Sequence, residues 1–103
     1  MRWISYKESS LTTGNNDFYV TVGKNATIKQ IDIFIQAPLG DVSCEVFDDE
    51  VTGGPGFAET YYNSGRSIKV NYMLQNSDGK LGVRISGLTE TDSDAYLNIG
   101  YEL

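Results

Sequence analysis

The chain has 103 residues, which suits one domain around one hydrophobic core, and we expect residues 1–103 to form a single β-sandwich domain. A hydrophobic content of 40% with 21% charged residues is ordinary for a globular protein and argues against a disordered chain. The net charge of -6 argues against nucleic acid and anionic membranes as partners, because both are negatively charged.

The sequence offers no recognisable targeting segment. The first eight residues lack the apolar run of a signal peptide, and no stretch approaches the ~18 apolar residues of a membrane-spanning helix. We therefore expect no membrane partner and assign no cellular location.

Alternation of apolar and polar residues, interrupted by turn residues, predicts about eight short strands and little or no helix. Residues 3–7 form a short first segment whose assignment is ambiguous. The other predicted strands, in chain order, are Phe18–Val22, Ile31–Gln36, Val42–Val46, Phe57–Tyr62, Ile68–Leu74, Leu81–Ile85 and Ala95–Tyr101. Ile28 is out of register with Ile31, which indicates a bulge near Lys29 and Gln30.

This pattern predicts an all-β fold, an antiparallel β-sandwich of about eight strands that is jelly-roll-like. An immunoglobulin-like sandwich is the next choice, but its paired cysteines and central tryptophan are missing, since Cys44 is the only cysteine and Trp3 is terminal. Cys44 alternates with Val42 and Val46, so we expect it to be a small buried hydrophobe.

Two hairpins follow from matching the apolar residues of neighbouring segments. Pairing Leu74 with Leu81 brings the apolar residues of both strands to one face, and pairing Ala37 with Val42 does the same. Either hairpin fails if its two strands belong to different sheets.

Several aromatic residues fall on otherwise polar strand faces. The second hairpin places Phe34 and Phe47 diagonally adjacent and away from the isoleucines, and Tyr19 and Tyr96 also point outward. Tyr62 follows another tyrosine, so one of the two is exposed. These residues are candidates for a subunit contact or a sugar-stacking surface, although a covering loop would explain them equally well.

Two acidic loops are candidate ligands for a cation. Asp48, Asp49 and Glu50 follow one another, and Asp92 and Asp94 lie in a second loop. Ca²⁺ prefers several oxygen ligands, so calcium is the one cofactor that these loops could hold, if they meet. No spacing matches an EF-hand, and solvated acidic loops are the alternative interpretation.

The chain contains no histidine, which removes the commonest general base, the Ser-His-Asp arrangement and most zinc sites. We therefore predict that the protein is not an enzyme. The favoured hypothesis is a structural subunit that self-associates or docks on a larger protein scaffold, as virion decoration and appendage proteins do. The alternative is a carbohydrate-binding module that stacks sugars on Phe34, Phe47, Tyr19 or Tyr62, with or without calcium. An inhibitor or effector that binds another protein is a third option.

Overall fold

The computed structural model describes residues 1–36, 42–51, 54–62 and 65–103, and these residues form eight strands. The strands are β1 (Arg2–Leu11), β2 (Asn16–Thr21), β3 (Thr27–Ile35), β4 (Val42–Asp48), β5 (Gly56–Tyr62), β6 (Gly65–Met73), β7 (Lys80–Ser86) and β8 (Ser93–Glu102). The described part of the chain contains no helix that could cross a membrane. The predicted all-β fold is thus confirmed.

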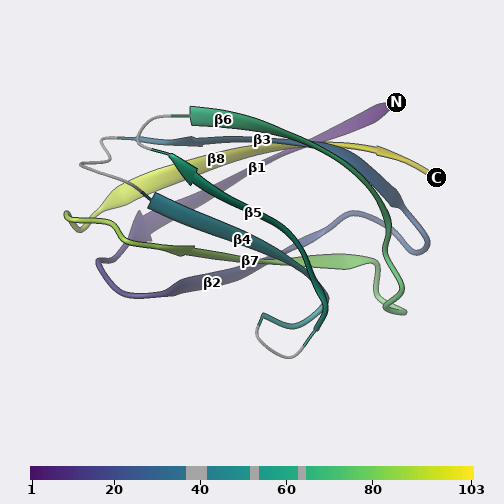
Figure 1. Ribbon diagram of the computed structural model, residues 1–103, viewed down its shortest axis with the longest axis horizontal. Coiled ribbons are helices and arrows are strands. Elements are labelled where there is room, and N and C mark those ends of the chain that lie inside the picture. The colour runs from purple at the N-terminus through teal and green to yellow at the C-terminus, as the bar shows by residue number, and fades with distance from the viewer. Residues whose placement is uncertain (37–41, 52–53, 63–64) are drawn as a thin grey trace.

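The strands form two antiparallel four-stranded sheets packed face to face (Figure 1). Sheet I has the order β1-β8-β3-β6, and sheet II has the order β2-β7-β4-β5. Read from the ends of the chain inward, β1 pairs with β8, β2 with β7, β3 with β6 and β4 with β5. The chain is therefore one long hairpin rolled so that successive pairs alternate between the sheets. This is the jelly roll that the sequence predicts.

The core is the apolar layer between the sheets, and the alternation predicted from the sequence supplies it. The fully buried large side chains come from strands of both sheets; examples are Ile31 and Ile99 of sheet I and Val46 and Val83 of sheet II. Cys44 belongs to this layer, as predicted, and burial raises the pKa of its thiol to about 12, with Glu45 adding to the effect.

Both predicted hairpins are wrong. β3 and β4 lie in different sheets, and so do β6 and β7, so neither Ile35 with Cys44 nor Leu74 with Leu81 can pair. The apolar residues do meet, but across the core rather than within one sheet. Matching of apolar faces cannot separate these two arrangements, because both bury the same side chains. The turn at Pro38 lies outside the described residues.

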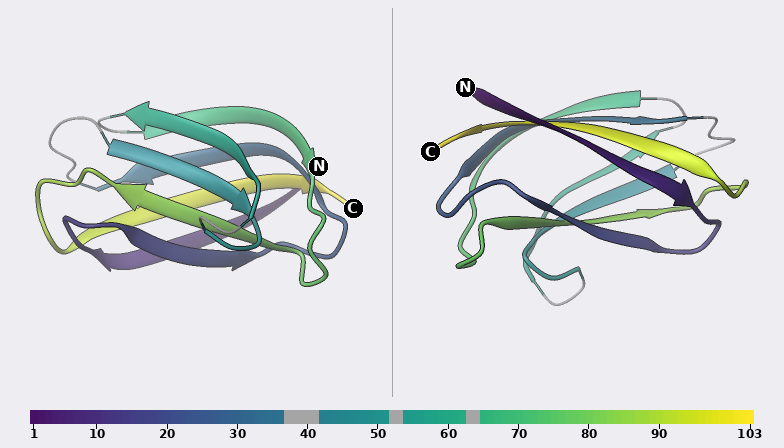
Figure 2. Two further views of the ribbon diagram at one scale, coloured as in Figure 1. Left: turned by 60° about the horizontal axis from the view of Figure 1, so that its bottom comes forward. Right: turned by 180° about the vertical axis from the view of Figure 1, so that it is seen from behind.

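Two details of the strands refine the sequence analysis. The bulge expected near Lys29 and Gln30 is confirmed, since the register of β3 shifts between Ile28 and Gln30 against both neighbours. The ambiguous first segment is a ten-residue strand at the edge of sheet I, with a regular register from Arg2 to Glu8 and a bulge before Leu11. Seen from behind, β1 lies in front, and the two chain termini lie at the same end (Figure 2, right).

One stacked aromatic pair bridges the two sheets along each open side of the sandwich. Tyr6 of β1 stacks on Phe18 of β2 with ring centroids 5.7 Å apart, and Phe57 of β5 stacks on Tyr72 of β6 at 4.3 Å.

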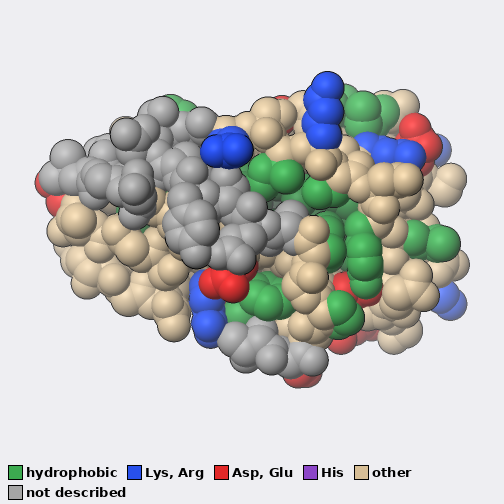
Figure 3. Space-filling view, viewed as in Figure 1, with side chains coloured by type: hydrophobic (Ala, Val, Ile, Leu, Met, Phe, Trp, Pro, Cys, Tyr) green, Lys and Arg blue, Asp and Glu red, His purple; other side chains and the backbone are tan. Residues whose placement is uncertain are grey.

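Figure 3 views the molecule from the same direction as Figure 1 and shows hydrophobic side chains in the middle of that face. Basic side chains lie above them, where Figure 1 draws β6 and β3.

A buried carboxylate joins the sheets where the chain passes from β6 to β7. Asp48 ends β4 of sheet II, yet its oxygens accept hydrogen bonds from the Tyr72 hydroxyl at 2.8 Å, the Gln75 amide at 2.8 Å and the Asn76 Nδ2 at 2.6 Å. Burial alone would raise the pKa of Asp48, but the donated hydrogen bonds outweigh burial and hold this pKa below its usual value. Asp48 is therefore a structural acceptor between the sheets.

Replacing Asp48 should be costly, because Tyr72, Gln75 and Asn76 would lose their shared acceptor. We expect Asp48→Ala to lower the free energy of unfolding by about 2–3 kcal/mol in urea denaturation. The matched control is Asp17→Ala, which breaks an exposed ion pair with Arg84 (2.8 Å). The control should cost less than about 1 kcal/mol. Equal losses in the two variants would contradict this role of Asp48.

The same carboxylate should make stability depend on pH. Because the folded pKa of Asp48 lies below its unfolded value of about 3.8, the stabilisation is present above that pH and is lost as pH falls through the folded pKa. Urea titrations from pH 7 to pH 2.5 should therefore show that the free energy of unfolding falls more steeply with pH for the wild type than for Asp48→Ala. Parallel pH profiles would show that the hydrogen bonds to Asp48 contribute nothing.

Candidate functional site

Exposed apolar side chains are concentrated on the outer face of sheet I. Among the described residues, seven large hydrophobic side chains are exposed, and five of them belong to the strands of sheet I or to Met1 next to β1. These five are Met1, Trp3, Phe34, Met73 and Tyr96. The remaining two are Tyr19, on β2, and the C-terminal Leu103. Such a concentration on one face of a small protein is a feature of binding surfaces.

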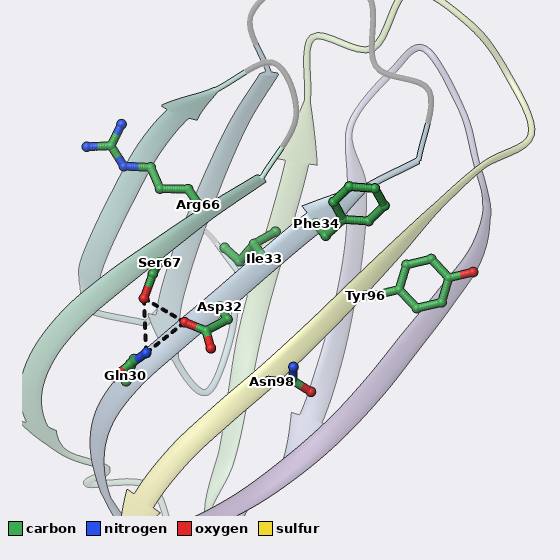
Figure 4. Close-up of a pocket in the computed structure, with 8 residues that line it drawn as sticks. All are labelled: Gln30, Asp32, Ile33, Phe34, Arg66, Ser67, Tyr96 and Asn98. Carbon is green, nitrogen blue, oxygen red and sulfur yellow. Dashed lines mark hydrogen bonds between the residues drawn. The ribbon is translucent and has the colours of Figure 1, made fainter.

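One end of this face carries an aromatic pair. Phe34 of β3 and Tyr96 of β8 are register partners with ring centroids 6.3 Å apart, and their exposed fractions are 52% and 40%. Figure 4 shows the two rings side by side above the sheet. The Lys7 ammonium lies 5.5 Å from the Tyr96 ring centroid and 3.6 Å from an Asp94 oxygen, so it has a partner on both residues.

The other end carries Trp3, and its position depends on a glycine. Gly100 is the register partner of Trp3 on β8, and a Cβ at Gly100 would approach two atoms of the Trp3 six-membered ring to 3.0 and 3.1 Å. The ring therefore rests over the glycine while 49% of the side chain stays exposed. A larger residue at Gly100 would push the indole off the sheet.

Polar side chains occupy the strip between the two aromatic ends. The Ser5 hydroxyl donates to the Asn98 Oδ1 at 2.8 Å, and the Ser67 hydroxyl donates to the Asp32 Oδ1 at 2.6 Å. Gln30 donates to the same Asp32 oxygen at 2.9 Å (Figure 4). These hydrogen bonds hold the polar groups in fixed orientations on the sheet surface.

Sheet I also differs from the rest of the molecule in charge. Its four strands contain five basic and four acidic residues, whereas the rest of the chain contains three basic and ten acidic residues. The acidic excess therefore lies outside sheet I. Its outer face can approach another surface without the repulsion that the net charge of -6 would otherwise cause.

The predicted neighbours Phe34 and Phe47 do not meet, because they lie on different sheets. Phe47 is half-buried and packs over Gly56, since a Cβ there would lie 3.3 Å from the Phe47 ring. Tyr19 is exposed on sheet II, with the Lys80 ammonium 4.8 Å from its ring centroid. Of the described aromatic candidates, the structure thus brings together only Phe34 and Tyr96.

Tyr62 lies at the end of β5, and its backbone pairs with Val42. Its side chain is outside the described part of the structure, so its proposed role as a contact residue stays a prediction.

The two acidic loops lie at opposite ends of the sandwich (Figure 1). Asp48 pairs with Leu81 near the start of β7, whereas Asp92 and Asp94 follow the end of that strand. Among the described residues, no three His, Cys, Asp or Glu side chains are grouped so that they could hold a metal ion. The two loops therefore do not meet to form one cation site, and calcium binding by Asp48, Asp49 and Glu50 alone stays a prediction.

Calcium should not stabilise the folded protein, because the oxygens of Asp48 already accept hydrogen bonds from protein donors. We expect thermal unfolding with 5 mM CaCl₂ and with chelator to give the same midpoint to within about 1 °C, since a ligand stabilises only the state that binds it. A higher midpoint with calcium that Asp49→Asn abolishes would establish a calcium site that the described residues do not explain.

Sequence reasoning missed most of the residues on the outer face of sheet I, above all Trp3, Asp32 and Asn98. The alternation of Trp3, Ser5 and Lys7 was the signal that could have placed Trp3 on this face. Asp32 and Asn98 gave no such signal, because they become neighbours only through the pairing of β3 with β8.

The fold and this face define a jelly-roll β-sandwich protein with an aromatic and polar outer face. No protein-family model and no curated protein matches the chain. Among solved structures, it is similar to the coat protein of Tobacco streak virus, with a TM-score of 0.44 and 15% identity over 96% of this chain and 84% of that chain. A structure of the dimer of that coat protein is similar with a TM-score of 0.44 and 16% identity, over 99% of this chain and 85% of that chain. At these values the likeness carries no information about what this chain binds.

Proposed function

We propose that this chain is a non-enzymatic structural subunit that pairs with a second copy of itself along the free edge of β1. The observation that carries this proposal is the self-complementary sequence of that strand, Arg2-Trp3-Ile4-Ser5-Tyr6-Lys7-Glu8. A subunit of this kind would serve in a larger particle, and virion decoration or appendage proteins are one such class.

The edge of β1 is suited to pairing. β1 is ten residues long, about 33 Å, and within the described structure it pairs only with β8. It contains no proline, and its register is regular from Arg2 to Glu8, where the bulge begins. A long, regular edge strand presents a row of backbone donors and acceptors to another strand.

An antiparallel pairing centred on Ser5 matches every side chain with a suitable partner. Arg2 faces Glu8 of the second copy, Trp3 faces Lys7, and Ile4 faces Tyr6. Opposite charges, a cation beside an aromatic ring and two apolar residues each stabilise a cross-strand pair. Inward-facing residues meet inward-facing residues, so both copies keep their cores.

Burial along β1 is consistent with this pairing. Ile4 and Tyr6 point toward the core but stay only partly buried, because no strand covers them on the outer side of β1. A paired strand would cover both residues, and removing apolar surface from water favours association.

Two of the other edge strands, β6 and β2, are less suited to self-pairing. β6, at the opposite edge of sheet I, contains Arg66 and Lys69 and no acidic residue, so two copies would bring like charges together. β2 has only six residues.

A charge exchange tests the proposed register. Glu8→Lys should place two pairs of like charges across the dimer and weaken it by about tenfold in sedimentation equilibrium. Arg2→Glu should do the same. The double variant, Arg2→Glu with Glu8→Lys, restores opposite charges and should restore the dimer.

The control is Glu102→Lys, which makes the same charge change on β8, away from the edge. It should leave the association constant within about twofold of the wild type, as expected for an exposed charge outside the interface. If the double variant dimerises as weakly as either single variant, the proposed register is contradicted.

A further inference from the structure

We propose that the outer face of sheet I binds a neutral oligosaccharide that lies between the Phe34–Tyr96 pair and Trp3. This site goes beyond the self-association proposed above and does not require a second copy, because Trp3, Phe34, Tyr96 and Asn98 all belong to one chain.

The face is hollowed where such a ligand would lie. A shallow depression of about 490 Å³ is lined by Asp32, Phe34, Tyr96 and Asn98, among others. A second depression, of about 380 Å³, continues along Tyr96 and Asn98 to Ser5, and a third of about 340 Å³ joins Asp32 and Asn98 to Trp3. Asn98 lines all three, so the three depressions lie next to one another on the outer face of sheet I.

The middle of the depression offers hydrogen-bonding groups of both kinds. Asp32 and Asn98 are register partners on β3 and β8. One oxygen of each side chain already accepts a hydrogen bond from a neighbour. Among the described residues, the second Asp32 oxygen and the Asn98 Nδ2 have no protein partner. An acceptor next to a donor suits a hydroxyl group, which both donates and accepts.

The ends of the depression offer aromatic rings. Trp3 stands four residues from Lys7, the register partner of Tyr96, so the two aromatic ends are about 13 Å apart along the strands. Exposed rings that carry polar groups beside them match the alternating apolar faces and hydroxyl edges of a sugar chain. A ligand that reaches both ends must be an oligosaccharide rather than a single sugar.

The charge of the face favours an uncharged ligand. The strands of sheet I carry nearly equal numbers of basic and acidic residues, and the carboxylate at the centre of the depression belongs to Asp32. An anionic sugar would be repelled by the Asp32 carboxylate at the centre of the depression.

The arrangement also distinguishes this ligand from a protein partner. Protein interfaces place apolar groups at the centre and polar groups at the rim. Here the polar groups, Ser5, Asp32, Ser67 and Asn98, lie in the middle, and the aromatic rings lie at the two ends. Figure 4 shows the Phe34–Tyr96 end beside Asp32, Ser67 and Asn98.

Affinity electrophoresis tests this inference on the intact chain. Native gels would contain one of the neutral polysaccharides mixed-linkage β-glucan, galactomannan, arabinoxylan and dextran, or one of the acidic polysaccharides alginate and hyaluronan. At least one neutral polymer should retard the wild type, and neither acidic polymer should. Tyr96→Ala and Asn98→Ala should each weaken that retardation by about tenfold or more.

Tyr19→Ala is the matched control, because Tyr19 is an equally exposed tyrosine beside a lysine, on the other sheet. It should leave the retardation unchanged. The inference is overturned if no neutral polymer retards the wild type, if an acidic polymer binds better, or if Tyr19→Ala weakens binding as much as Tyr96→Ala. A fall in molar mass for Tyr96→Ala without any polysaccharide binding would assign the face to a protein partner instead.

Discussion

The apolar layer between the two sheets fixes the side of the sheet on which every strand residue lies. Because side chains alternate along a strand, burying Ile31, Ile33 and Ile35 against Val42, Cys44 and Val46 forces their neighbours outward. Phe34, Asp32 and Asn98 are therefore on the outer face for the same reason that the isoleucines are inside. The two stacked aromatic pairs join the sheets along the open sides of the sandwich, and Asp48 joins them at the β6–β7 connection.

Two surfaces remain available to partners once the core residues are buried. We propose that a second copy binds at one of them and an oligosaccharide at the other. The free edge of β1 offers unpaired backbone groups, whereas the outer face of sheet I offers side chains alone. Pairing along β1 would join two copies of sheet I into one continuous sheet of eight strands, with two oligosaccharide sites on the same surface. Two linked sites bind a polymer more tightly than one, because the second contact is intramolecular. The assembly and the glycan site would thus support each other, and Trp3 of β1 would contribute to both.

The sequence predicts the jelly roll, the bulge near Lys29 and Gln30 and the burial of Cys44, because these depend on alternation within single strands. It misassigns the hairpins, because residues such as Leu74 and Leu81 bury the same faces whether their strands pair in one sheet or oppose each other across the core. The candidate site suffers from the same ambiguity. Phe34 and Tyr96 are identifiable as outward aromatics, but their contact, and the pairing of Asp32 with Asn98, require the order β1-β8-β3-β6.

Amide hydrogen exchange at low and high protein concentration tests the central claim, the pairing of two copies along β1, most directly. Raising the concentration should slow exchange at those amides of residues 2–8 that are not bonded to β8, since the second copy's strand would accept their hydrogen bonds. The amides along the free edge of β6 should exchange at the same rate at both concentrations. Unchanged exchange in β1 across the concentration range, or new protection at β6 instead, would contradict the account.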